Sequence, residues 1–238
     1  AANLEFKGAD KNGDGNVSED ELAVLLASKA AAGGYAAPVN AQVKSVFESL
    51  DKDKSDALST PEMQSLPSDA ALAAFFPADE DKDGKINESE LMAALTAAAE
   101  PGPAPTDADV LAILNENDLL GDGTLDVLEY ASVVAANLEF KGADKNGDGN
   151  VSFDELKALL ASKAAAGGYA APLDVQVQSV FDSLDTDKSE ALSTAEMHGL
   201  PSDAVLAAFF PADENKDGTI NESELMVALT AAASPGPA

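Results

Sequence analysis

The feature that most constrains this chain is the twelve-residue segment from Asp10 to Glu21. It carries oxygen-bearing side chains at positions one, three, five, nine and twelve and a glycine at position six. A short turn that gathers so many oxygens suits a hard cation, which takes six to eight oxygen ligands and has little use for sulfur or imidazole. The pattern begins again, with varying fidelity, at Asp51, Asp79, Asp118, Asp144, Asp185 and Asp213. The sequence therefore predicts seven cation-binding loops, numbered below in chain order.

Calcium is the cation that the first loop predicts. Three side chains point inward as the loop curls, a backbone carbonyl at position seven adds an oxygen, a serine holds a water, and the closing glutamate binds through both oxygens. Gly15 permits the sharp turn. These ligands are Asp10, Asn12, Asp14, Asn16, Ser18 and Glu21.

At these residues the chain resembles the EF-hand family of calcium-binding proteins. The resemblance implies a helix, the loop and a second helix at each site, a unit called a hand below. It implies an all-α fold of tandem hands in an extended or bent array, with short β-contacts between the position-eight residues of paired loops. The flanking sequence agrees, because Leu22, Leu25 and Leu26 recur at helical spacing after the first loop.

The resemblance also assigns Ca²⁺ ligands, residue by residue, in three further loops that match throughout. In the third loop these are Asp79, Asp81, Asp83, Lys85, Asn87 and Glu90. In the fifth they are Asp144, Asn146, Asp148, Asn150, Ser152 and Glu155. In the seventh they are Asp213, Asn215, Asp217, Thr219, Asn221 and Glu224.

The second and sixth loops keep their ligands but lack the glycine. Asp56 and Glu190 stand at position six, where a left-handed backbone costs a non-glycine residue about 1 kcal/mol. We expect weakened calcium binding at both loops. Their ligands are Asp51, Asp53, Ser55, Ala57, Ser59 and Glu62, and Asp185, Asp187, Ser189, Ala191, Ser193 and Glu196.

The fourth loop departs furthest from the pattern, because Leu120 stands at position three in place of an oxygen ligand. One interpretation is that a backbone carbonyl, a water, Asn115 or Asn117 supplies the missing oxygen. The other is that the loop pairs structurally and binds no ion. The ligands that it keeps are Asp118, Asp122, Thr124, Asp126 and Glu129.

Internal repetition sets the expected domains. The segment from Asn3 to Asp10 returns unchanged at Asn137 to Asp144, a period of 134 residues that holds four loops. We expect hands 1 and 2 in residues 1–66, hands 3 and 4 in 67–134, hands 5 and 6 in 135–200, and hand 7 in 201–238. A start in mid-repeat favours a fragment of a longer array over a processed protein that has lost one hand.

Spacing predicts which loops pair. Only 14 residues, without proline, separate Glu129 from Asp144. They favour a single shared helix, which at about 1.5 Å per residue would hold the fourth and fifth loops about 21 Å apart. Paired loops approach to about 5 Å. The pairs are therefore one with two, three with four and five with six, and we expect the seventh hand to self-associate with another molecule.

Composition narrows the partners. A formal charge of -29 argues against nucleic acid and anionic membranes, although seven calcium ions would add +14 and leave -15. The chain has no cysteine, and its single histidine, His198, has no catalytic partner, so we expect neither catalytic residues nor an organic cofactor. No signal peptide and no apolar run of about 18 residues is present, and the compartment stays open.

Three roles compete within calcium binding. A structural or contractile array would change shape as calcium neutralises its loops, and length changes would sum along the repeats. A buffer would only store ions. A sensor would grip a target helix with a flexible, Met-rich surface, for which four methionines are few. We rank the structural role first, the buffer second and the sensor third, with a further protein partner left undefined.

Overall fold

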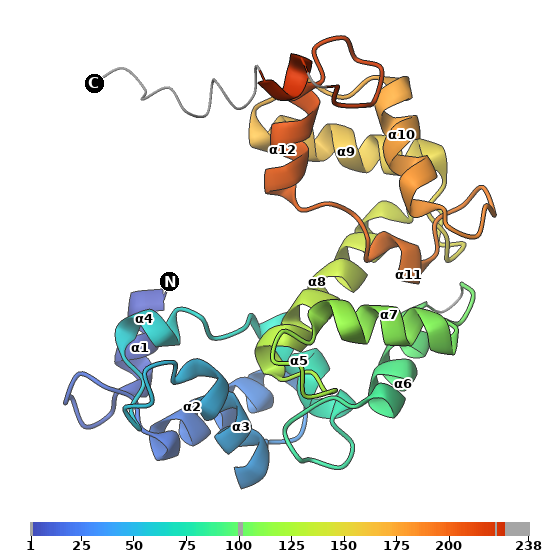
Figure 1. Ribbon diagram of the computed structural model, residues 1–238. Helices are drawn as coiled ribbons and strands as arrows, with labels where there is room; N and C mark the ends of the chain where they lie inside the picture. The colour runs from blue at the N-terminus through green and yellow to red at the C-terminus, as the bar shows by residue number, and fades with distance from the viewer. Residues whose placement is uncertain (1, 100–101, 222, 227–238) are drawn as a thin grey trace, which may run out of the picture. The chain divides into compact units, whose positions relative to one another are not determined.

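The structure is a computed structural model that describes residues 2–99, 102–221 and 223–226. Helices joined by short loops make up these ranges, which contain isolated β-bridges but no longer strand. The predicted all-α class is confirmed. The helices are α1 Ala2–Ala9, α2 Glu19–Gly33, α3 Asn40–Leu50, α4 Thr60–Met63, α5 Asp69–Ala78, α6 Glu88–Ala99, α7 Asp107–Asn117, α8 Val127–Ala143, α9 Phe153–Gly167, α10 Asp174–Leu184, α11 Thr194–Met197 and α12 Asp203–Ala212 (Figure 1).

Polar caps fix where the helices begin and end. At the start of α2 the Ser18 hydroxyl accepts the N–H of Glu21, and the Glu21 carboxylate accepts the N–H of Ser18. Ser68 caps α5 by accepting the N–H of Ala71 at 3.2 Å. Helix α2 ends at Gly33 and is capped by Gly34, whose φ of 75° suits glycine. A serine at position nine of a loop, such as Ser18, therefore serves as the N-cap of the helix that follows the loop.

The chain divides into two compact units. The first comprises residues 1–98 and 104–136, and the second comprises 99–103 and 137–238. Helix α8 runs unbroken from Val127 to Ala143, as predicted for the helix shared by the fourth and fifth loops, and contributes residues to both units. The finer division at residues 66, 134 and 200 remains a prediction, and hand 7 extends beyond the described residues.

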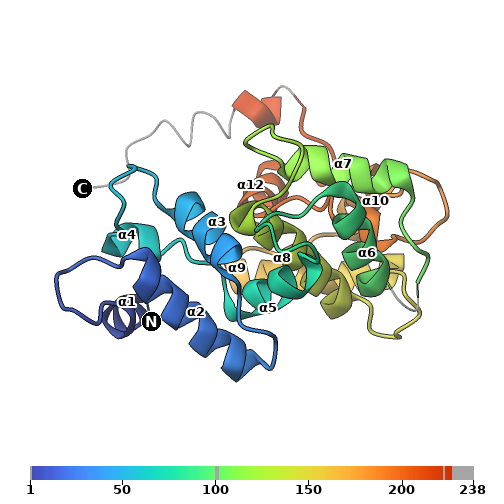
Figure 2. The same cartoon turned by 90° about the horizontal axis from the view of Figure 1, so that it is seen from below.

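In the first unit, antiparallel bridges join the first loop to the second and the third to the fourth. Val17 pairs with Leu58, and Ile86 pairs with Leu125. All four side chains are fully buried. Helix α2 packs against α3 and α5 (Figure 2). These contacts bring four loops into one compact unit.

In the second unit a third bridge, between Val151 and Leu192, joins the fifth and sixth loops. Helix α9 packs against α10 and α12, and the core includes Val177, Leu206 and Phe210. The three bridges join the same loops that spacing predicts to pair. None of the helices in the described ranges has the length and apolar character needed to cross a lipid bilayer.

Candidate metal centres

The aspartate at position one organises every loop by accepting the N–H of the residue at position six. The distance from this nitrogen to Oδ2 of the aspartate runs from 2.8 Å, for Gly123 and Asp118, to 3.1 Å, for Gly15 and Asp10. The same bond forms in the other five loops. Each loop is therefore curled around its first predicted ligand, whether or not glycine stands at position six.

The glutamate at position twelve reaches back across the loop. In the first loop Glu21 accepts the N–H of Ser18 at 3.0 Å and that of Lys11 at 2.8 Å. Hydrogen bonds from Ser18 and Lys11 lower the pKa of Glu21 to about 2, so it is ionised at neutral pH. The equivalent glutamates accept the N–H of their own position-nine residue at 2.8 to 3.0 Å: Glu62, Glu90, Glu129, Glu155, Glu196 and Glu224.

Positions three, five and seven form a chain of short turns. In the first loop Asn12 accepts the N–H of Asp14 at 2.8 Å, and Asp14 accepts the N–H of Asn16 at 2.9 Å. Other position-three side chains accept in the same way: Asp53, Asp81, Asn146, Asp187 and Asn215. Position-five carboxylates accept the backbone N–H of the position-seven residue in the same way, and these residues are Lys85, Thr124, Asn150 and Thr219. The predicted oxygen donors of one loop therefore lie together.

Several of these carboxylates are buried without a counter-charge. Among the described residues the buried loop carboxylates are Asp51, Glu62, Asp79, Glu90, Asp126, Glu129, Asp213 and Glu224, and none of them takes part in an ion pair of those ranges. Removing an anion from water without a counter-charge is unfavourable. Burial accordingly raises the pKa of Asp79, which is 1% exposed. A bound cation would supply the missing charge.

Three loops bring carboxylate oxygens close enough to share one ion. In each, one oxygen from each of three residues lies within 4.8 Å of the others: Asp51, Asp53 and Glu62; Asp79, Asp81 and Asp83; Asp185, Asp187 and Glu196. Like charges at such distances repel. An all-oxygen donor set of this kind fits Ca²⁺ and suits neither zinc nor copper.

Two buried glutamines hold position-one aspartates, and the sequence patterns did not single them out. Gln42 Nε2 donates to Asp79 Oδ2 at 3.0 Å, and Gln176 Nε2 donates to Asp213 Oδ2 at 2.9 Å. Both glutamines are 3% exposed and lie in the first turn of α3 and α10. Their signal in the sequence is a polar residue on an apolar helix face at the same place in both repeats.

The backbone shows strain that the ligand pattern predicts only in part. Asp56 and Glu190 adopt the left-handed conformation at position six, with φ of 58° and 64°. Position four is left-handed too, and in these two loops it is occupied by Lys54 and Lys188, with φ of 55° and 59°. Glycine stands at both positions in the first, fourth and fifth loops. The second and sixth loops therefore each carry two strained residues, at about 1 kcal/mol apiece.

The fourth loop differs in its chemistry. Leu120 is 69% exposed and offers no oxygen. Asn117, one of the residues considered as a replacement ligand, donates instead to the carbonyl of Ile113 at 2.8 Å, so its side chain turns back along α7. The ammonium of Lys85, from the third loop, forms an ion pair with Oδ2 of Asp122. A lysine thus already neutralises a carboxylate that a cation would need.

Helix, loop and helix units whose loops meet in bridged pairs define a class of cation-binding protein. A family model described as EF hand matches residues 5–26, 77–95, 139–160 and 209–229. The chain is therefore an EF-hand calcium-binding protein. The four matched segments contain the loops that begin at Asp10, Asp79, Asp144 and Asp213, the same four whose ligand pattern is complete.

Among solved structures, the chain is similar to a homolog of programmed cell death 6 protein from Leishmania major Friedlin. The two share 21% sequence identity over 67% of this chain and 91% of that one, with a TM-score of 0.35. A superposition this loose carries no argument about function. A comparison with curated proteins found no match.

Proposed function

We propose that six of the seven loops bind Ca²⁺ through the ligands predicted above, and that the fourth loop pairs with the third without binding an ion. The observation that carries this proposal is that six loops keep oxygen-bearing side chains at positions one, three, five, nine and twelve and are curled around their position-one aspartate. In the second, third and seventh of these loops, buried carboxylates without an ion-pair partner among the described residues add support. The fourth loop differs from the others because it has no oxygen ligand at position three and because the carboxylate of Asp122 already forms an ion pair with Lys85.

We further propose a calcium-responsive structural role. The first unit contains four loops, and in its second and third loops one oxygen from each of three carboxylates lies within 4.8 Å of the others. In the absence of calcium their repulsion opposes the folded arrangement, and bound ions remove that repulsion. Each unit would then become more ordered when calcium rises.

Calcium stoichiometry and molecular size test the two parts separately. Native mass spectrometry at saturating calcium is expected to find six ions, one in every loop except the fourth. Small-angle scattering with calcium and with a chelator is expected to show contraction toward about 18 Å, the radius of gyration of a compact chain of this length. Magnesium at the same concentration is the control.

The two alternative roles predict other results. A buffer would bind the six ions with no change in radius of gyration. A sensor would bind a hydrophobic dye only after calcium is added, because a target-binding groove would open. An unchanged radius of gyration would refute the structural role while leaving calcium binding intact, and dye binding in that case would favour the sensor over the buffer.

A further inference from the structure

The first and fifth loops share a dipeptide that the other five loops lack at the same place. Asparagine stands at position three and glycine at position four, as Asn12-Gly13 and Asn146-Gly147. All four residues are exposed. A Cβ atom added to either glycine would meet no heavy atom of a more distant residue within 4 Å. Two predicted calcium ligands therefore each precede a backbone nitrogen that no side chain covers.

This dipeptide is open to an intramolecular reaction. The backbone nitrogen of Gly13 would bond to Cγ of Asn12, the bond from Cγ to Nδ2 would break, and Nδ2 would leave as ammonia with the proton of the Gly13 N–H. Water would then open the resulting succinimide ring at one of its two carbonyl carbons. Opening at Cγ leaves aspartate, and opening at the main-chain carbon leaves isoaspartate. Glycine hinders the attack least because it has no Cβ.

We propose that Asn12 and Asn146 are deamidation sites whose reactivity calcium controls. The inference deepens the calcium binding proposed for the first and fifth loops and rests on it. In the first loop the N–H of Gly13 donates to Oδ1 of Asp10 at 2.7 Å. The fifth loop forms the equivalent bond at the same distance. A succinimide nitrogen carries no hydrogen, so ring closure must break this bond and requires the loop to open.

The amide that must be attacked is held by the curled loop as well. Oδ1 of Asn12 accepts the N–H of Asp14 at 2.8 Å. Oδ1 of Asn146 accepts the N–H of Asp148 at 2.8 Å, and its Nδ2 donates to the Asp148 carboxylate at 2.8 Å. The position-three oxygen is also the one that would bind calcium. Calcium binding therefore favours the arrangement that ring closure has to leave.

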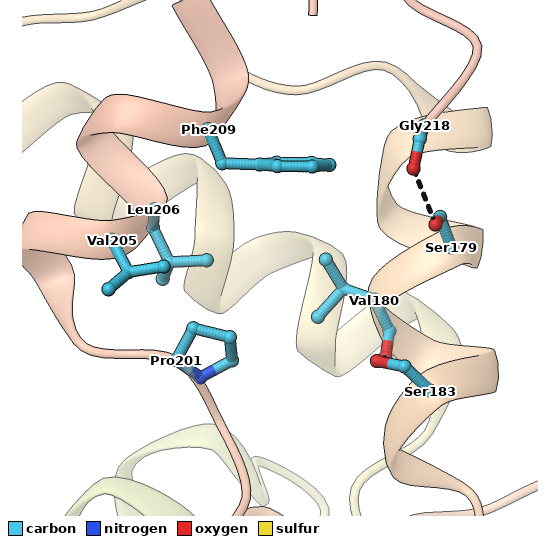
Figure 3. A pocket seen from close by; sticks show the side chains of 8 residues that line it. All are labelled: Ser179, Val180, Ser183, Pro201, Val205, Leu206, Phe209 and Gly218. Atoms are coloured by element: carbon cyan, nitrogen blue, oxygen red, sulfur yellow. Dashed lines mark hydrogen bonds between the residues drawn. The ribbon is translucent and has the colours of Figure 1, made fainter. Parts of the chain in front are cut away.

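The seventh loop has a tether that these two loops do not have. Ser179 on α10 donates to the carbonyl of Gly218 at 2.6 Å (Figure 3), and Gln176 on the same helix holds Asp213. Within the ranges that the structure describes, the position-one and position-six groups of the first and fifth loops bond inside their own loop. Opening the first or fifth loop therefore breaks fewer hydrogen bonds to a neighbouring helix.

The two products would affect calcium binding differently. Aspartate keeps an oxygen ligand, and it already stands at position three in the second, third and sixth loops, as Asp53, Asp81 and Asp187. Isoaspartate adds one atom to the main chain at position three, so it displaces the ligands before it relative to those after it. We expect a loop that forms isoaspartate to lose its ion. Time spent without calcium would then cause a permanent loss of sites.

Incubation of the full chain with calcium and with a chelator tests this control. Peptide mapping by mass spectrometry locates each aspartate and isoaspartate. If only the open, calcium-free loop reacts, calcium at about 100 times its dissociation constant should slow the conversion of Asn12 and Asn146 about 100-fold. Asn215 is the internal comparison, because it stands at position three but precedes Lys216. It should remain asparagine while the other two convert.

The matched variant combines Gly13→Lys with Gly147→Lys. It keeps both asparagines, and its side chains hinder the attack. Lysine already stands at position four in four loops, with φ from 55° to 62°: Lys54, Lys82, Lys188 and Lys216. We expect this variant to bind six ions and to release no ammonia in the chelator. Conversion as fast as in the wild type would overturn the proposal. So would a wild type that stays unconverted in the chelator while the denatured chain converts.

Counting bound ions in the same samples separates a failure of this inference from a failure of the proposed function. Equal rates with and without calcium, in a protein that binds six ions, would refute the control by calcium alone. Equal rates in a protein that binds only four, with the first and fifth loops empty, would refute calcium binding at those loops as well. After long incubation in the chelator, added calcium should fill fewer than six sites in the wild type and all six in the lysine variant.

Discussion

Replacing the closing glutamate of the fourth loop should leave calcium stoichiometry unchanged. The change is Glu129→Gln, and its matched control is Glu155→Gln in the fifth loop, whose ligand set is complete. We expect six ions in the wild type, six in Glu129→Gln and five in Glu155→Gln. Native mass spectrometry counts the ions, and circular dichroism confirms that each variant is folded.

The magnitude follows from the contacts of Asp122. Its Oδ1 accepts the N–H and hydroxyl of Thr124 at 3.0 and 2.6 Å, and its Oδ2 is paired with Lys85. The ion pair is more than a third exposed on both sides, so it contributes about 1 kcal/mol at most. Lys85→Thr alone would therefore change affinity by less than about tenfold and create no site. Lys85→Thr combined with Leu120→Asp supplies the missing oxygen and should raise the count to seven.

One result would refute this reasoning. If Glu129→Gln lost an ion relative to the wild type, the fourth loop would bind calcium despite Leu120 and Lys85. The same conclusion would follow if the double variant bound no more calcium than the wild type and the wild type already bound seven ions. Adding Glu129→Gln to the double variant should remove the seventh ion and so assign it to the fourth loop.

Three further predictions concern the remaining loops. Glu190→Gly should stabilise the calcium-free protein by about 1 kcal/mol in chemical denaturation because it relieves a left-handed glutamate, and Asp56→Gly should gain less; a loss of stability would contradict the backbone argument. Gln176→Ala and Gln42→Ala should weaken calcium binding at the seventh and third loops by about 10- to 100-fold in titration calorimetry, whereas unchanged affinities would show that these glutamines only fill space. Chelation should lower the melting temperature, since each site at a hundredfold excess over its dissociation constant adds about 2.7 kcal/mol; an unchanged melting curve would mean that the loops bind too weakly to stabilise the fold.

Much of the fold follows from the sequence because the loops carry local rules. Position-nine serines such as Ser18 serve as helix caps, so the ligand pattern also fixes where the next helix begins. The short, proline-free segment between Glu129 and Asp144 predicted a single helix, and α8 is that helix. Both features are determined by residues that lie close together in the chain, so the sequence alone predicts them.

Features that depend on distant residues were not predictable in the same way. Gln42 reaches Asp79, and Lys85 reaches Asp122, across 37 residues each. No spacing rule relates such pairs, because tertiary packing brings them together. The left-handed Lys54 and Lys188 at position four were missed for another reason: the ligand pattern places no demand on that position, although the turn does.

The bond from Gln42 to Asp79 has a consequence for how the sites respond to one another. Gln42 belongs to the helix that enters the second loop, yet its amide holds the first ligand of the third. Any shift of that helix on filling the second loop alters the free energy of filling the third, and thermodynamic reciprocity requires the reverse effect to be equal. The calcium affinity of the third loop should therefore change when the second loop is disabled by Glu62→Gln, and Gln42→Ala should remove that dependence.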